Sequence, residues 1–167
     1  MPSIELYLVR HAIAAERGTE WPDDTTRPLT KRGISRFREC VRGLRELEVS
    51  LDEIFTSPLV RAKQTADILA AGMDGKPSVK MLEALGPGHT VQNVMAQLAK
   101  VAKRRRIALV GHEPELGELA AQLIGARHAI PFKKGGVCRV DLERLTPKDV
   151  GTLIWFVGPK VLRQLAT

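Results

Sequence analysis

Residues 4–12 read IELYLVRHA, an apolar run with branched and aromatic side chains that ends in an arginine and a histidine. Such a run is typical of a buried strand. A second apolar run, Ile107 to Gly111, is followed in the same way by His112. Side chains at strand ends in an α/β sheet leave the packed core and face a crevice, where ligands bind. The two runs therefore predict that Arg10, His11 and His112 meet in one pocket.

The remainder of the chain shows helical and strand patterns. Apolar residues recur every three or four positions in segments 31–47, 59–71, 91–101 and 114–124, which predicts helices there. Short apolar runs predict further strands at 51–55, 79–82, 137–142 and 152–157. Thr30 is the expected N-cap of the first helix, and Pro58 is expected to open the second. These units predict a three-layer α/β/α sandwich with a mixed, mostly parallel central sheet.

The composition is that of one globular domain, which we expect to span residues 1–167. Hydrophobic residues make up 44% and charged residues 27%, whereas aromatic residues are only 4%, so the core must be mainly aliphatic. The formal net charge is +7. Such a charge either keeps the surface hydrated or attracts anions, which include phosphates, acidic protein surfaces and nucleic acid.

Neither the cysteines nor the N-terminus indicates secretion. Cys40 and Cys138 could form one disulfide, but their apolar surroundings favour buried free thiols in a reducing compartment. They form no CxxC pair and have no neighbouring histidine, so no zinc or redox site is expected. The N-terminus has no basic region before its apolar run, and no apolar stretch is long enough to cross a bilayer. We therefore expect a cytoplasmic protein.

Arg10 and His11 together suit chemistry at phosphorus. A neutral imidazole is a nucleophile toward phosphorus and forms a covalent phosphohistidine, which divides one difficult step into two easier ones. Nearby arginines disfavour protonation of the ring and bind phosphoryl oxygens in a bidentate manner. An Arg-His pair by itself is common, so this interpretation depends on the other polar residues that the fold brings to the same site.

Two further segments place polar groups at a strand-to-helix turn. In SPLVRAKQTA, residues 57–66, Arg61 falls in the first turn of a predicted helix, where free backbone N–H groups favour an anion. In GHEP, residues 111–114, His112 can donate a hydrogen bond to a phosphoryl oxygen as charge moves in the transition state. The alternatives are an arginine lying along a surface helix and a histidine satisfied in the core.

In combination these motifs resemble the histidine phosphatase superfamily, also called phosphoglycerate mutase-like. The first strand with Arg10-His11, the segment 57–66 and Gly111-His112 follow one another as in that family. RPLT at residues 27–30 and KKG at 133–135 are similar to its small SixA-type branch of phosphohistidine phosphatases. The similarity extends over nearly the whole chain.

The resemblance implies a fold and a set of site residues. The fold is phosphoglycerate mutase-like with a minimal helical insertion. His11 is the implied nucleophile. Arg10, Arg61 and His112 are implied to complete a pocket for phosphate or another oxyanion.

The general acid that protonates the leaving group is the least defined part of the site. Larger members of the superfamily place a glutamate after the middle strand, and Glu83 lies in that region. A solvent-facing glutamate is the alternative. If the substrate is phosphohistidine, the departing imidazole is a good leaving group, because its conjugate acid has a pKa of only about 6.5. A missing acid therefore favours an N–P substrate over a phosphate ester.

The short chain favours a protein substrate. Residues 82–112 have room for one helix and a turn, so the long insertion that roofs the pocket in larger relatives is missing. An unroofed pocket can admit a side chain presented by another protein. The expected partner is a phosphorylated protein, in particular a histidine phosphotransfer domain. The loop from Ala12 to Pro28 is expected to form one wall of the cleft, and Lys133 and Lys134 could steer an acidic partner.

Two other functions fit parts of the sequence. A small-molecule phosphomonoesterase acting on sugar phosphates or nucleotides gains support if Glu83 points into the pocket. A non-catalytic scaffold could bind RNA or an acidic protein through the basic run 103–106, but the few aromatic residues offer no stacking platform for single strands. No metal or other cofactor is expected, because the pocket is built from cations. Neither nucleic acid nor a membrane is expected as a partner.

Overall fold

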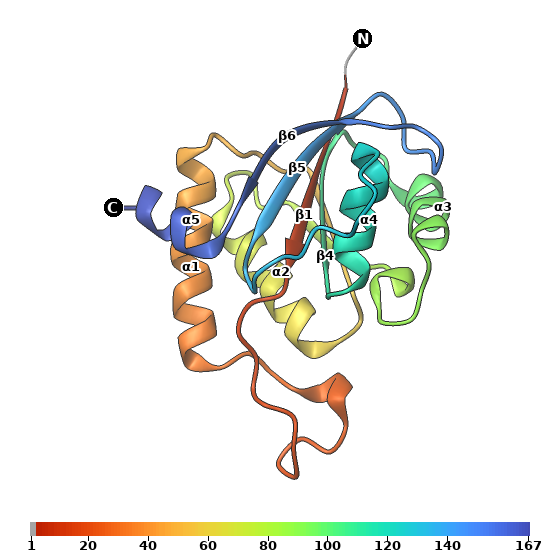
Figure 1. The fold of residues 1–167 in the computed structure, drawn as a ribbon. Helices are drawn as coiled ribbons and strands as arrows, with labels where there is room; N and C mark the ends of the chain where they lie inside the picture. Colours follow the sequence, from red (N-terminus) through yellow and green to blue (C-terminus); the bar gives the residue numbers. More distant parts are fainter. Residues whose placement is uncertain (1–2) are drawn as a thin grey trace.

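Six strands form one mixed sheet in the computed structural model, which describes residues 3–167 (Figure 1). The strands are β1 Ile4–Arg10, β2 Glu53–Thr56, β3 Ser78–Met81, β4 Arg106–Gly111, β5 Val137–Leu142 and β6 Thr152–Val157. Their order in the sheet is β3-β2-β4-β1-β5-β6. The first four in that order are parallel, whereas β5 pairs antiparallel with both β1 and β6. The predicted mixed, mostly parallel sheet is confirmed.

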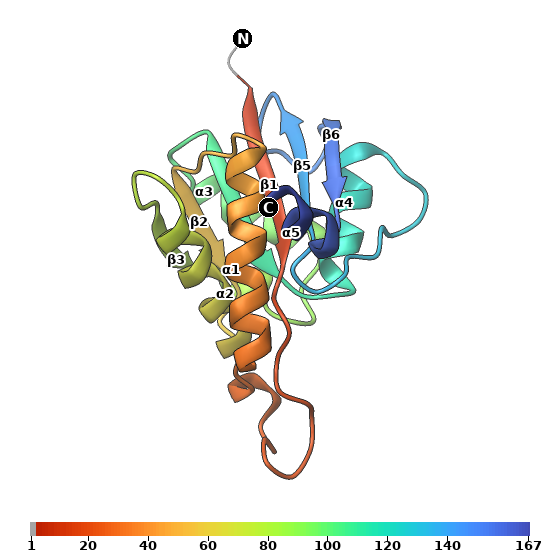
Figure 2. The same cartoon turned by 90° about the vertical axis from the view of Figure 1, so that its left-hand side faces the viewer.

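Helices cover both faces of this sheet. They are α1 Lys31–Glu46, α2 Val60–Gly72, α3 Val91–Val101, α4 Glu115–Ile124 and α5 Pro159–Leu165, with short 3-10 helices η1 Asp24–Thr26 and η2 Glu83–Leu85. α1, α2 and α5 lie on one face, and α3 and α4 lie on the other (Figures 1 and 2). The predicted three-layer α/β/α sandwich is therefore confirmed.

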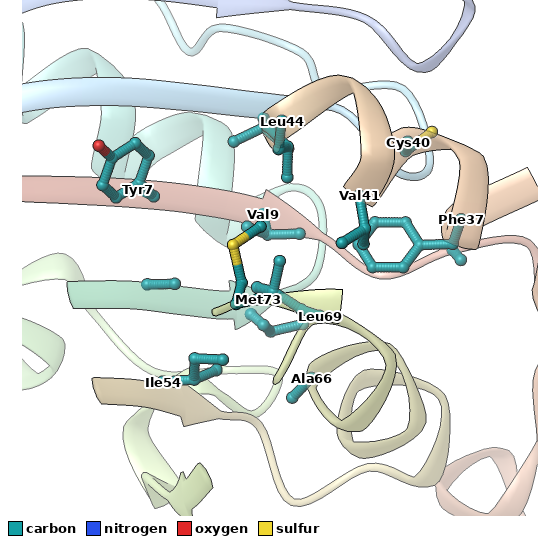
Figure 3. Packing of buried hydrophobic residues seen from close by; sticks show 14 of the residues in the cluster. Tyr7, Val9, Phe37, Cys40, Val41, Leu44, Ile54, Ala66, Leu69 and Met73 are labelled. Atoms are coloured by element: carbon teal, nitrogen blue, oxygen red, sulfur yellow. The ribbon is translucent and has the colours of Figure 1, made fainter. Parts of the chain in front are cut away.

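The central strand β1 contributes to two hydrophobic cores because successive side chains of a strand point to opposite faces. Tyr7 and Val9 pack among the residues of α1 and α2, including Leu44 and Leu69 (Figure 3). Leu6 and Leu8 pack against α3 and α4 on the other face. This burial on both faces explains why the run is apolar without alternation.

Helix boundaries follow local capping. The Thr30 hydroxyl accepts a hydrogen bond from Gly33 N at 2.9 Å, as expected of the N-cap of α1. The expected role of Pro58 is wrong, because Leu59 is the N-cap of α2 and the helix begins at Val60. Pro58 lies one residue before the cap, where its missing N–H is likewise no loss.

Helix α5 was not expected from the sequence, because its seven residues span too few turns to show a helical period. It begins at Pro159 and packs on α1 (Figure 2). A Cβ at Gly43 of α1 would lie 2.0 Å from the carbonyl oxygen of Leu162, so only glycine permits this close approach.

Two expectations about cysteines and membranes concern the whole fold. Cys40 and Cys138 are both free and buried, as the sequence favoured. In the described part of the chain, no helix combines the length and the apolar character needed to cross a bilayer.

Candidate active site

The candidate site lies at the carboxyl ends of three adjacent parallel strands. β1 ends at Arg10 and its neighbour β4 ends at Gly111, and these two residues are paired across the sheet. His11 and His112 follow directly, and the backbone N–H of His11 donates to the carbonyl of Gly111 at 3.1 Å. The two imidazole rings are 5.2 Å apart between centroids. The strand register thus brings together two histidines that are a hundred residues apart in sequence.

These side chains line a cavity of about 320 Å³. Its walls carry five cations, two histidines and two carboxylates, namely Arg10, Arg17, Arg27, Arg61, Lys134, His11, His112, Glu16 and Glu113. The loop that follows β1 supplies part of this wall, as expected. A larger cavity of about 450 Å³ lies between α1 and α2, but no histidine lines it. The charge and the nucleophilic groups therefore identify the smaller cavity as the reactive one.

His11 is held in one tautomer by a backbone contact. Its Nδ1 lies 2.7 Å from the carbonyl oxygen of Ala12. A carbonyl oxygen only accepts, so Nδ1 carries the proton and Nε2 keeps its lone pair. The N–H of Ala12 in turn donates to the Thr65 hydroxyl at 3.0 Å, which anchors the backbone that orients the ring. The histidine is thereby prepared as a nucleophile through Nε2.

The electrostatic surroundings keep both imidazoles neutral. Burial lowers the pKa of His11 from 6.5 to about 3, and the neighbouring Arg61, Arg10 and His112 act in the same direction against the hydrogen bond to Ala12. Burial, with Arg61 next in effect, lowers the pKa of His112 to about 4. The His112 Nε2 lies 2.6 Å from the Ser57 hydroxyl, at the end of β2.

Two arginines complete the positive wall of the cavity. Arg10 donates from Nη1 to the carbonyl oxygen of Phe132 at 2.6 Å. Arg61, at the start of α2, donates to the backbone carbonyl of Asp24 at 2.8 Å and to its carboxylate at 3.2 Å. Both guanidiniums are thus held by fixed acceptors in the wall of the cavity that they line, which orients them for a phosphoryl group.

Several buried polar atoms of these side chains have no hydrogen-bond partner. Four buried side-chain polar atoms lack a hydrogen-bond partner within residues 3–167, and three of them are Arg10 Nε, Arg61 Nε and His112 Nδ1. Buried unpaired polar groups are uncommon and costly. The three residues line one cavity, whose positive charge fits an anion. No group of three His, Cys, Asp or Glu side chains in the described residues is arranged to hold a metal ion.

Two carboxylates at this site were not singled out from the sequence. Asp24 binds the guanidinium of Arg27 at 2.8 Å and that of Arg61, and so connects the loop after β1 to the pocket. Glu113 accepts a hydrogen bond from the N–H of Phe132 at 3.2 Å, and the carbonyl oxygen of Phe132 accepts the hydrogen bond from Arg10. Asp24 lies in a polar loop without periodicity, so no sequence signal marks it. Glu113 stands in the GHEP motif, and its position beside His112 is the signal.

Glu83 is not brought into the cavity. It begins η2, is exposed to solvent and does not line the cavity that contains His11. Its assignment as general acid stays a prediction, and no contact in the structure supports it. The sequence placed it correctly after β3, but the short η2 turns its side chain outward.

The lowered pKa values predict how the site responds to acid. Because the folded-state values lie below the ordinary 6.5, both rings stay neutral at pH 5.5, where an unperturbed histidine is mostly protonated. At pH values between the folded-state pKa of each histidine and the unfolded-state value of 6.5, the unfolded chain binds protons that the folded chain does not. The free energy of unfolding therefore falls as the pH is lowered through this range. Nitrogen-detected NMR of the ring atoms measures their protonation state, and urea denaturation at pH 7 and pH 5 measures the change in the free energy of unfolding. Protonated rings at pH 5.5 would contradict the prediction.

Comparison with known proteins identifies the family. The model of the histidine phosphatase superfamily (branch 1) matches residues 6–86. An uncharacterized protein of Picosynechococcus sp. is 38% identical over 165 residues, which cover 95% of this chain and 99% of the relative. The phosphohistidine phosphatase SixA of Escherichia coli is 25% identical over 158 residues, which cover 93% of this chain and 94% of SixA.

A solved structure agrees with these sequence matches. The protein histidine phosphatase SixA complexed with tungstate superposes with a TM-score of 0.82 at 25% identity, covering 95% of this chain and 99% of that one. The chain belongs to the histidine phosphatase superfamily and is a phosphatase of that class. Within the superfamily it is similar to SixA over almost its whole length, which confirms the resemblance seen in the motifs.

Proposed function

We propose that this phosphatase hydrolyses phosphohistidine on a protein, through a covalent phosphohistidine at His11. The observation that carries the proposal is the combination of a neutral His11 with Arg10, Arg61 and His112 around the same cavity. A phosphoryl group supplies the negative charge and the acceptor oxygens that complement these side chains.

The first chemical step is transfer of the phosphoryl group to the enzyme. The Nε2 lone pair of His11 forms a bond to phosphorus while the N–P bond of the substrate breaks. The second ring nitrogen of the substrate takes a proton from solvent, so the electron pair of the broken bond leaves with a neutral imidazole. Arg10, Arg61 and His112 stabilise the negative charge on the phosphoryl oxygens during transfer.

The second step returns the enzyme to its starting state. A water molecule attacks phosphorus, the bond to His11 Nε2 breaks, and inorganic phosphate is released with a proton passing to solvent. The hydrogen bond from His11 Nδ1 to the Ala12 carbonyl is present throughout, so the same nitrogen is regenerated as the nucleophile.

The leaving group supports a phosphohistidine substrate. Once its second ring nitrogen is protonated, the ring departs as neutral imidazole and needs no further acid from the enzyme, because the conjugate acid of imidazole has a pKa of about 6.5. This suits a site where Glu83 is exposed and the Glu113 carboxylate already accepts a backbone hydrogen bond. Between β3 and β4 the chain forms only η2 and α3, and this short connection favours access by a side chain on another protein.

One observation favours the alternative, a phosphomonoesterase acting on sugar phosphates or nucleotides. The carboxylates of Glu16 and Glu113 both line the cavity. Burial raises the pKa of Glu113, which makes this carboxyl a better proton donor near neutral pH. An alkoxide leaving group needs such a donor far more than imidazole does.

A substrate panel separates the two functions. A histidine phosphotransfer domain phosphorylated on its histidine is compared with sugar phosphates and nucleotides, in the presence of a metal chelator and with His11→Ala as the blank. We expect the highest kcat/KM for the phosphohistidine protein. A preference for a phosphate ester would overturn the proposal and establish the phosphomonoesterase. We further propose a cytoplasmic location, which the two free, buried cysteines favour.

A further inference from the structure

A second cavity adjoins the phosphate pocket. It has a volume of about 120 Å³ and lies between α1, the turn at residues 133–135 and α5. Four cations line it, namely Arg36, Lys134, Lys160 and Arg163, above a floor that includes Phe37 and Cys40. The helices α1 and α5 lie side by side in this region (Figure 2).

The two cavities share a wall. Lys134 lines both of them. The next residue, Gly135, donates its N–H to the carbonyl oxygens of Arg10 and His11 at 3.1 and 3.2 Å, which fixes the turn to the strand that carries the nucleophile. Gly135 has a φ of +84°, a conformation that favours glycine, and a Cβ there would lie 3.6 Å from both Phe37 and Pro159. The second cavity is therefore held at a fixed position beside the reactive histidine.

The protein compensates the charge of this cavity only in part. No carboxylate lines it. Arg36, Lys134 and Lys160 form no ion pair within residues 3–167, and Arg163 has only a 3.8 Å contact with Glu39. Elsewhere on α1, Arg45 pairs with Asp74 at 3.1 Å, so the helix does not leave all its arginines unpaired. Like charges gathered in a hollow create a positive potential that attracts an anion.

We propose that this cavity binds an acidic side chain of the substrate protein, next to the phosphohistidine that enters the main pocket. The inference rests on the proposed function and specifies the surface of its partner. Pockets for small ligands enclose about 300–1,000 Å³, so a volume of 120 Å³ suits a single side-chain carboxylate rather than a nucleotide or sugar. A docked protein would thus place one anion in each cavity, with Lys134 between them.

The test asks whether the second cavity affects the reaction only when the substrate is a protein. The variant Lys160→Glu changes an exposed residue that does not line the catalytic cavity, so the phosphate pocket stays intact. Arg36→Gln is a second variant that removes one charge without reversing it. Arg104→Glu is the matched control, because it makes the same charge change just before β4, at the opposite end of the sheet. The substrates are a phosphorylated histidine phosphotransfer domain and phosphoimidazole, which has the same N–P bond without a protein surface.

We expect Lys160→Glu to raise KM for the phosphoprotein by about three- to tenfold with little change in kcat, and Arg36→Gln to raise it less. Both variants should hydrolyse phosphoimidazole at the wild-type rate, and Arg104→Glu should change KM by less than about twofold. Equal effects of Lys160→Glu and Arg104→Glu would overturn the docking cavity, as would equal losses on both substrates. If the wild-type enzyme leaves the phosphoprotein untouched, the proposed function itself is wrong and the cavity proposal is rejected with it.

Discussion

Replacement of His11 by alanine is expected to lower kcat/KM by about 10⁵-fold, because the variant has no atom that can form the bond to phosphorus. The remaining donors of Arg10, Arg61 and His112 still bind the phosphoryl group, so substrate binding is expected to persist. Release of inorganic phosphate measures the loss. Rapid quenching of the wild-type reaction in alkali, where the N–P bond survives, should trap a phosphorylated enzyme that the variant does not form.

The control for this substitution is His128→Ala. His128 is exposed and lies outside the cavity, so its removal should leave turnover unchanged. Circular dichroism and thermal unfolding show whether His11→Ala keeps the fold. This check is needed because removal of the buried ring creates a cavity, which destabilises the protein. Turnover close to the wild-type value in a folded His11→Ala protein would exclude the covalent mechanism.

The positions of the main site residues could be predicted because they depend on strand ends. Parallel strands present their carboxyl ends at one edge, and the strand order β2-β4-β1 places the segments after Thr56, Gly111 and Arg10 next to one another. Apolar runs and a helical period are enough to find those ends in the sequence. The convergence of Arg10, His11 and His112 follows from the sheet, and Arg61 joins them from the first turn of α2, the helix that follows β2.

The remaining parts of the site depend on tertiary contacts that leave no periodic signal. Asp24 reaches Arg61 only because the loop after β1 folds back over α2, and the chain separation of the two residues gives no hint of this contact. Helix α5 supplies Lys160 and Arg163 to the second cavity, but it is too short for its period to be recognised. The outward direction of Glu83 is likewise set by one short turn.

The second large effect is expected for Arg61→Ala. Loss of one donor to the developing charge in the transition state typically costs about 3 kcal/mol, which corresponds to about 150-fold in kcat/KM. The Arg61 side chain is 4% exposed and lines the cavity, where the N–H groups not bound to Asp24 can donate to a phosphoryl oxygen. Steady-state kinetics should show a lower kcat with a smaller change in KM, because the interaction strengthens as charge develops.

Arg61 also holds Asp24, so the loss of loop anchoring must be separated from the loss of the donor. Asp24→Ala breaks the same ion pair but keeps the guanidinium, and its effect on kcat should be much smaller than that of Arg61→Ala. Arg45→Ala removes an arginine from the exposed pair with Asp74 and should leave kinetics unchanged. If Asp24→Ala lowers kcat as much as Arg61→Ala does, the role of Arg61 is to position the loop rather than to bind the phosphoryl group. The three variants together therefore decide whether the charge at the start of α2 acts on the reacting phosphorus or on the loop that forms part of the cavity wall.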